Sequence, residues 1–98
     1  KMKDTITEYQ FVSEMSKDKH GFSFEGASAL FEYLTQYEED CGTEIEFDPI
    51  AFRCEYDEYK NLKEIKENYQ DIKNLDDLRN HTSVIEIPNT QRIIIQAY

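Results

Sequence analysis

The residues best suited to chemistry in this sequence are carboxylates that crowd one predicted turn, in the stretch YEEDCGTEIEFDP, residues 37–49. Calcium is the first ligand to consider, because an EF-hand loop places acids at positions 1, 3 and 5 before a glycine at position 6. When Gly42 is set at position 6, position 1 is Tyr37 and position 5 is Cys41, so the pattern does not match. A looser carboxylate metal site stays open as an alternative, but we expect no metal and no cofactor.

Other catalytic signatures are absent from the sequence. It contains no glycine-rich phosphate loop and no G-x-S-x-G nucleophile motif. His20 and His81 fall in separate predicted loops, and Cys41 and Cys54 have neither C-x-x-C spacing nor a local histidine signature. Such cysteines are typical of reduced thiols that pack as small hydrophobic residues. We therefore expect a protein that is not an enzyme, and keep a metal-dependent or hydrolytic enzyme as the third alternative.

The charge of the chain is concentrated in its middle third. The 98 residues carry a formal net charge of −10. Residues 25–58 contain eleven acidic residues and a single basic residue, Arg53, so this segment accounts for the whole net charge. A charge of this sign opposes direct binding to nucleic acid or to anionic lipid. It favours a basic partner, or it serves solubility alone.

The length fits a single domain over residues 1–98. No apolar run approaches the ~20 residues that a membrane helix needs. Residues 1–4 lead into no apolar signal-peptide core, and Met2 is expected to be the natural first residue. We expect a cytoplasmic protein.

Capping residues and hydrophobic periodicity predict two N-terminal helices. The first is predicted to run from a capping box at Thr5–Glu8 to about Met15. Ser23 can cap a longer second helix over Phe24–Asp40, which has an apolar stripe at helical spacing and which Gly42 ends.

The rest of the chain predicts a small antiparallel sheet and short helices, and so an α+β fold. Residues Ile45–Tyr56 alternate between apolar and polar, with Pro49 interrupting, which predicts an edge strand or two short strands. The later elements are predicted as short helices over Asn61–Tyr69 and from Asn74, then a C-terminal hairpin of strands over Thr82–Ile87 and Arg92–Ala97. We expect about three strands, covered on one face by the long helix.

The acidic residues lie at the end of the long helix and along the strand predicted after it. Glu38, Glu39 and Asp40 occupy the last helical turn, where the helix dipole disfavours negative charge. Alternate positions of a strand lie about 6.6–7 Å apart on one face, which is broadly similar to the spacing of successive phosphates in nucleic acid. We therefore predict a partner-binding surface made of Tyr37, Glu38, Glu39, Asp40, Glu44, Glu46, Asp48, Glu55, Asp57 and Glu58.

Tyrosines are interleaved with these acids. Large aromatic side chains often anchor protein interfaces, and Tyr33, Tyr37, Tyr56 and Tyr59 could serve here. The alternative is that they pack in the core or at its edge.

The phrase E-G-x-x-A-L-F-E-Y-L-x-x-Y-E-E-D-x-G-x-x-I-E-F-D-P-I-A, from Glu25 through Ala51, carries a resemblance. It resembles a family of small acidic proteins encoded by bacteriophages and other mobile elements, and the rest of the chain follows more loosely. The resemblance implies a mobile-element origin, where short acidic proteins often block host defence as anti-CRISPR or anti-restriction proteins. It assigns a role to no individual residue.

The leading functional prediction is a non-enzymatic inhibitor acting in a host bacterial cell. It would bind a basic nucleic-acid-handling protein, a CRISPR effector or a restriction enzyme, through an acidic surface that mimics nucleic acid. The second hypothesis is a structural or regulatory module that binds through an apolar patch. That module could be a homodimer joined at an edge strand over Ile93–Ile95.

Overall fold

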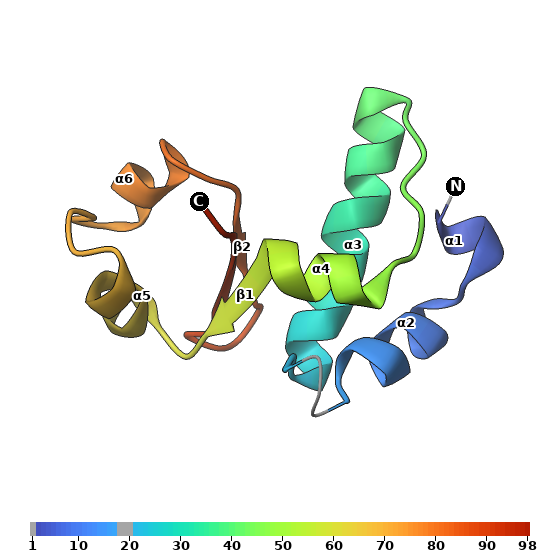
Figure 1. The fold of residues 1–98 in the computed structure, drawn as a ribbon, viewed down its shortest axis with the longest axis horizontal. Coiled ribbons are helices and arrows are strands. Elements are labelled where there is room, and N and C mark those ends of the chain that lie inside the picture. The colour runs from blue at the N-terminus through green and yellow to red at the C-terminus, as the bar shows by residue number, and fades with distance from the viewer. Residues whose placement is uncertain (1, 18–20) are drawn as a thin grey trace.

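The protein adopts an α+β fold in a computed structural model, which describes residues 2–17 and 21–98 (Figure 1). The elements are α1 (Met2–Thr5), α2 (Glu8–Met15), α3 (Phe24–Cys41), α4 (Pro49–Glu55), β1 (Tyr56–Tyr59), α5 (Leu62–Asn68), α6 (Leu75–Arg79), β2 (Val84–Glu86) and β3 (Ile93–Gln96). The predicted fold class is confirmed, and the predicted helices lie roughly where they were expected, but α1 and α4 were not predicted. His20, one of the two histidines considered above, lies outside the described residues.

The three strands form one antiparallel sheet in the order β1-β3-β2. Tyr56 pairs with Gln96 on one side of β3, and Val84 pairs with Ile95 on the other. The predicted C-terminal hairpin is therefore confirmed. The prediction of Ile93–Ile95 as an edge strand is wrong, because β3 is the central strand and both of its sides are already paired. A second copy of the chain cannot add to this strand.

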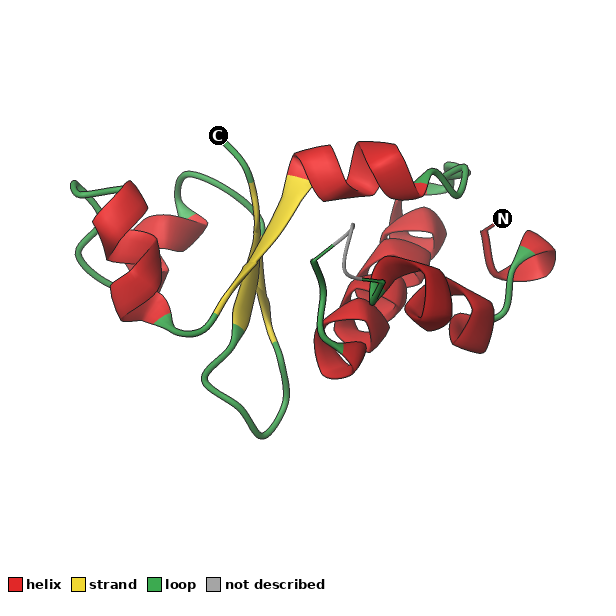
Figure 2. Ribbon diagram, turned by 60° about the horizontal axis from the view of Figure 1, so that its bottom comes forward, coloured by secondary structure: helices red, strands yellow, loops and turns green. Residues whose placement is uncertain are grey.

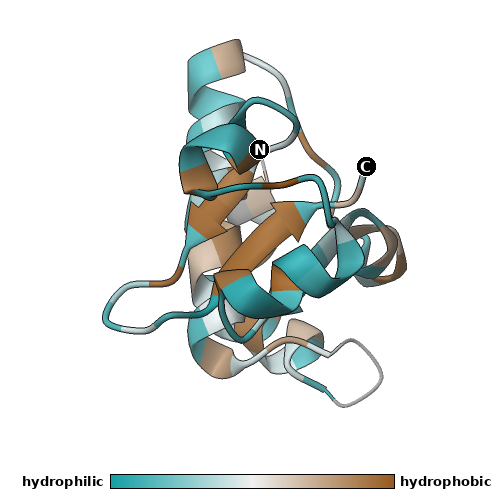
Figure 3. Ribbon diagram, turned by 90° about the vertical axis from the view of Figure 1, so that its left-hand side faces the viewer, coloured by the Kyte–Doolittle hydropathy of each residue, from teal (hydrophilic) through white to brown (hydrophobic). Residues whose placement is uncertain are grey.

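Helices cover both faces of the sheet, whereas the sequence predicted cover on one face only. The central strand alternates, so Ile94 packs with the larger cluster under α2 and α3, while Ile93 and Ile95 pack with a second cluster under α5 and α6. Figure 2 shows the strands between these two groups of helices, and Figure 3 shows strongly hydrophobic segments within the sheet. Burial on both faces explains why this strand is a continuous run of isoleucine.

The long helix α3 begins and ends where its capping residues predict. The Ser23 side chain accepts a hydrogen bond from the Gly26 N–H, and Gly42 ends the helix with a left-handed φ of 63°. The predicted inward stripe is confirmed except at its two ends, because Phe24 is 67% and Tyr37 is 47% exposed.

The N-terminal helix begins later than the sequence predicts. The capping box is formed by Thr7 and Gln10, whereas Thr5 and Glu8 were predicted to form it. Thr5 instead ends the short helix α1, and its hydroxyl donates to the Met2 carbonyl at 3.0 Å.

The strand predicted over residues 45–56 is wrong. The side chain of Asp48 accepts a hydrogen bond from the Ala51 N–H at 3.1 Å, and Pro49 occupies the first turn, so helix α4 forms here. A proline at this position needs no N–H partner, and its fixed φ suits a helix start. Of the residues expected to share an inward face, Ile50 is 66% exposed and Cys54 is exposed, while Phe52 is buried.

The carboxylate of Glu58 joins the sheet to the start of α3. Its side chain has no solvent exposure, and it accepts hydrogen bonds from the Ser23 N–H at 3.0 Å, from the Ser23 hydroxyl at 2.8 Å and from Nε of Arg92. A negative charge is favoured beside a helix N-terminus. Gly26 makes this approach possible, because a Cβ at that position would lie 1.9 Å from Oε1 of Glu58.

We predict that Gly26→Ala destabilises the protein, although alanine is the better helix former. The added methyl group displaces the Glu58 carboxylate from its donors, which should lower the free energy of unfolding by about 2–4 kcal/mol. Urea unfolding followed by circular dichroism measures the change. Gly42→Ala is the control, because nothing lies within 4 Å of its Cβ position. It should lose about 1 kcal/mol through its left-handed φ. A Gly26→Ala loss no greater than that of the control would contradict the role assigned to Glu58.

Candidate functional site

The predicted binding residues do not form one continuous surface. The structure separates them into an exposed group of six carboxylates, the exposed Tyr37, two buried carboxylates and one residue on the other face of the sheet. The exposed group lies at the end of α3, in the connection to α4 and at the end of α4, the green and yellow-green part of Figure 1. We call this group the acidic surface, and it consists of Glu39, Asp40, Glu44, Glu46, Asp48 and Glu55.

Glu38 was predicted on the binding surface, and the structure places it in the interior. Its side chain is 0% exposed. Oε2 accepts hydrogen bonds from the Met2 N–H at 2.9 Å and from the Ile45 N–H at 2.7 Å, and Oε1 accepts a longer one from Met2 at 3.2 Å. The sequence did hold a signal for this burial, because position 38 continues the inward stripe of Phe31 and Leu34 at helical spacing.

Glu58 and Asp57 are also separated from the acidic surface. Glu58 is fully occupied by Ser23 and Arg92, as described above. Asp57 is exposed but alternates with Glu58 along β1, so it lies on the sheet face that α5 and α6 cover. Burial raises the pKa of the Asp57 carboxyl above its ordinary value.

The segment between α3 and α4 displays its acids as predicted, although it is not a strand. Glu44, Glu46 and Asp48 are exposed, while Ile45 and Phe47 are partly buried against the core. The Ile45 N–H cannot join a sheet because the Glu38 carboxylate already accepts it. Side-chain hydrogen bonds therefore fix this segment, and Asp48 at its end caps α4.

The last turn of α3 keeps its negative charge next to the negative end of the helix dipole. It contains no basic residue. Asp40 accepts a hydrogen bond from Nε2 of Gln36 at 3.0 Å, which is an interaction within the helix surface. Each exposed negative charge at this end of a helix lowers the stability of the helix by roughly 0.3 kcal/mol or more.

A cavity of about 470 Å³ lies beside the acidic surface. We call it the tyrosine pocket, because Tyr33, Tyr37 and Tyr56 contribute to its walls. The ring centroids of Tyr33 and Tyr37 lie 6.5 Å apart in a stacked arrangement, and the rings of Tyr33 and Tyr56 meet edge to face at 6.5 Å. Glu46, Asp48 and Glu55 of the acidic surface line the same cavity.

Two tyrosines of this pocket have raised pKa values. Burial, followed by the nearby side chains of Tyr33, Glu55 and Tyr37, raises the pKa of Tyr56 to about 12. The electrostatic influence of the Cys41 side chain, followed by a hydrogen bond with the same side chain, raises the pKa of Tyr37. Both hydroxyls therefore remain protonated at neutral pH and can donate as well as accept hydrogen bonds. Tyr59, the fourth tyrosine considered from sequence, packs in the second cluster instead.

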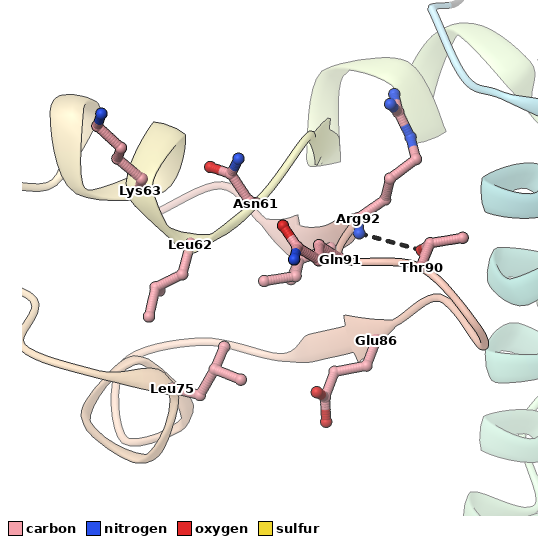
Figure 4. Close-up of a pocket in the computed structure, with 9 residues that line it drawn as sticks. Asn61, Leu62, Lys63, Leu75, Glu86, Thr90, Gln91 and Arg92 are labelled. Atoms are coloured by element: carbon pink, nitrogen blue, oxygen red, sulfur yellow. Dashed lines mark hydrogen bonds between the residues drawn. The ribbon is translucent and has the colours of Figure 1, made fainter.

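A second cavity, of about 480 Å³, lies between α5, α6 and the hairpin (Figure 4). Figure 4 shows Leu62 and Leu75 toward its interior, while the side chains of Lys63 and Arg92 point away from it. Arg92 binds Glu58, and Glu86 binds Arg79 at 2.5 Å. Because these charges are already paired, this cavity offers a ligand few open polar contacts.

The described residues hold no group of three or more His, Cys, Asp or Glu side chains arranged to bind a metal ion. Within the same residues, no helix combines the length and the apolar character needed to cross a membrane.

We predict that Glu38→Gln lowers the free energy of unfolding by about 1–2 kcal/mol, because it removes the charge that strengthens these hydrogen bonds and points an amide N–H toward Met2. The control is Glu46→Gln, an exposed change in the same segment, which should stay within about 0.5 kcal/mol of the parent protein. Urea unfolding measures both. Equal stability of the two variants would show that Glu38 does not hold the structure as described.

Comparison with known proteins adds no family to this description. No family model, no curated protein and no solved structure matches the chain. The description of the site therefore rests on the charge and geometry of the chain's own residues.

Proposed function

We propose that this protein is a non-enzymatic inhibitor that binds a basic, nucleic-acid-handling protein of a bacterial host. The partner would be a CRISPR effector or a restriction enzyme, and the acidic surface would occupy the groove that otherwise holds nucleic acid. The choice of host and partner class follows from the resemblance of Glu25–Ala51 to small acidic proteins of bacteriophages.

The observation that supports this proposal is the exposure of the acidic surface. Its six carboxylates lie on consecutive elements, from the end of α3 to the end of α4, and all are exposed. Arg53 is the sole basic residue in the sequence between Glu25 and Glu58. A concentrated field of one sign attracts an oppositely charged groove and speeds association, and both effects weaken in salt.

Displaying the charge in this way is unfavourable for the isolated protein. Like charges at the end of α3 repel each other and oppose the helix dipole. Solubility alone is served as well by charges of both signs spread over the surface. Binding to a positive groove offsets this repulsion. A binding role therefore accounts for the concentration of charge, whereas solubility alone does not.

The test uses a charge-reversed variant that leaves the buried carboxylates intact. We predict that Glu39→Lys, Asp40→Lys and Glu44→Lys together lower the retention of nucleic-acid-binding proteins from a bacterial lysate by roughly tenfold or more. The immobilised protein is washed at low and at high salt, with and without excess duplex DNA, and the retained proteins are quantified. Glu38 is excluded from the variant, because lysine at that position would disrupt the fold.

The matched control carries the same change in charge on the opposite side of the sheet. It consists of Glu67→Lys, Asp71→Lys and Asp76→Lys, at exposed positions in and between α5 and α6. This control should retain the partner. Unchanged retention by the first variant, or retention that duplex DNA cannot displace, would exclude nucleic-acid mimicry.

A further inference from the structure

The tyrosine pocket combines aromatic and acidic walls. Tyr33 and Tyr37 come from α3, and Tyr56 begins β1 directly after α4. The apolar part of the lining includes Leu34 and Phe52. The lining contains the carboxylates of Glu46, Asp48 and Glu55 but no lysine and no arginine.

Tyr56 brings a polar group to this pocket. The residue is only 7% exposed, and its ring packs edge to face against Tyr33. No hydrogen bond joins its hydroxyl to another residue of the described chain. The hydroxyl can therefore donate to or accept from a ligand in the cavity without breaking a bond within the protein.

The chemistry of the walls indicates a cationic ligand. Aromatic faces attract cations, and carboxylates bind them directly. A bare metal ion does not fit, because the described carboxylates do not converge on a metal site. An organic cation is large enough to contact the rings and carboxylates on separate walls of a cavity of about 470 Å³.

Among organic cations, a guanidinium group matches the lining best. It is planar and stacks on aromatic rings, and its five N–H donors can reach a carboxylate and a phenol oxygen together. An ammonium group is compact and more strongly hydrated, so it gains less from aromatic walls.

We propose that the tyrosine pocket binds an arginine side chain of the partner protein, with Tyr56 accepting a hydrogen bond from the guanidinium and Glu55 pairing with its charge. This inference rests on the proposed function for its partner, which is basic. It adds the residue type that the partner inserts and the place where that residue is held.

The test uses N-acetyl-arginine methylamide as a small probe, so it does not depend on finding the partner. Titration is followed by the amide chemical shifts of the 15N-labelled protein. Binding in about the millimolar range is expected for a ligand of this size, with shift changes at residues of the tyrosine pocket. The lysine analogue should bind more weakly, and equal binding of the two probes would overturn the assignment of a guanidinium.

The variant Tyr56→Phe separates binding from stability. It keeps the ring and removes the hydroxyl, so affinity for the arginine probe should fall roughly tenfold. The midpoint of thermal unfolding should not fall, because the hydroxyl has no hydrogen bond within the described chain to lose. A lower midpoint would mean that the hydroxyl already has a partner within the protein, and unchanged affinity would mean that it does not contact the ligand. Either result would overturn the proposal.

The control is Tyr59→Phe, the same change on the same strand but in the second cluster, and it should leave probe binding unaltered. The residues of this test differ from those changed in the lysate experiment. Probe binding that survives while lysate retention fails would therefore remove the nucleic-acid-mimic function and leave the arginine pocket. The reverse result would remove the pocket alone.

Discussion

The position of the acidic surface depends on one buried carboxylate, Glu38. It receives N–H groups from Met2, which is 36 residues earlier in the chain, and from Ile45, which is seven residues later. These two hydrogen bonds fix the start of α1 and the connection to α4 against the end of α3. A buried carboxylate is tolerated when several donors surround it, and removing its donors would leave a very unfavourable charge. Residues 2 and 45 must therefore both lie beside the buried Glu38 carboxylate.

The exposed carboxylates take their direction from that path. With the Ile45 N–H held inside, Ile45 and Phe47 pack on the core, and the acids that alternate with them, Glu44, Glu46 and Asp48, are exposed. Asp48 then caps the start of α4 by accepting a hydrogen bond from the Ala51 N–H. The strand that follows α4 places Tyr56 in the tyrosine pocket and Glu58 beside the start of α3. The same acidic segment thus contains two kinds of carboxylate. The buried carboxylates of Glu38 and Glu58 hold distant parts of the chain together, and the exposed carboxylates give the surface its charge.

Local signals in the sequence were enough to predict the elements whose ends are set by nearby residues. Ser23 and Gly42 cap the two ends of α3 as predicted, and α5 and α6 lie where short helices were predicted, with Asn61 and Asn74 as their N-caps. The alternation over residues 45–56 was misleading, because capping by Asp48 and Pro49 outweighed a period-2 pattern that had no neighbouring strand to pair with. Helical spacing could have indicated the burial of Glu38, but the distant donors of Glu38 and Glu58, which lie 36 and 35 residues away in sequence, could not be predicted from any local pattern.

Charge and shape contribute differently to the proposed interaction. The acidic surface acts over distances near the Debye length of about 8–10 Å, so it can attract any sufficiently basic protein but discriminates poorly between them. The tyrosine pocket acts only on contact, and it requires a group with both positive charge and a flat face. Because Glu46, Asp48 and Glu55 belong to both, attraction toward the surface brings a basic side chain to the mouth of the pocket. A rigid interior beneath them, held by Glu38, would keep the rings and carboxylates in place before the partner arrives, which lowers the entropy lost on binding.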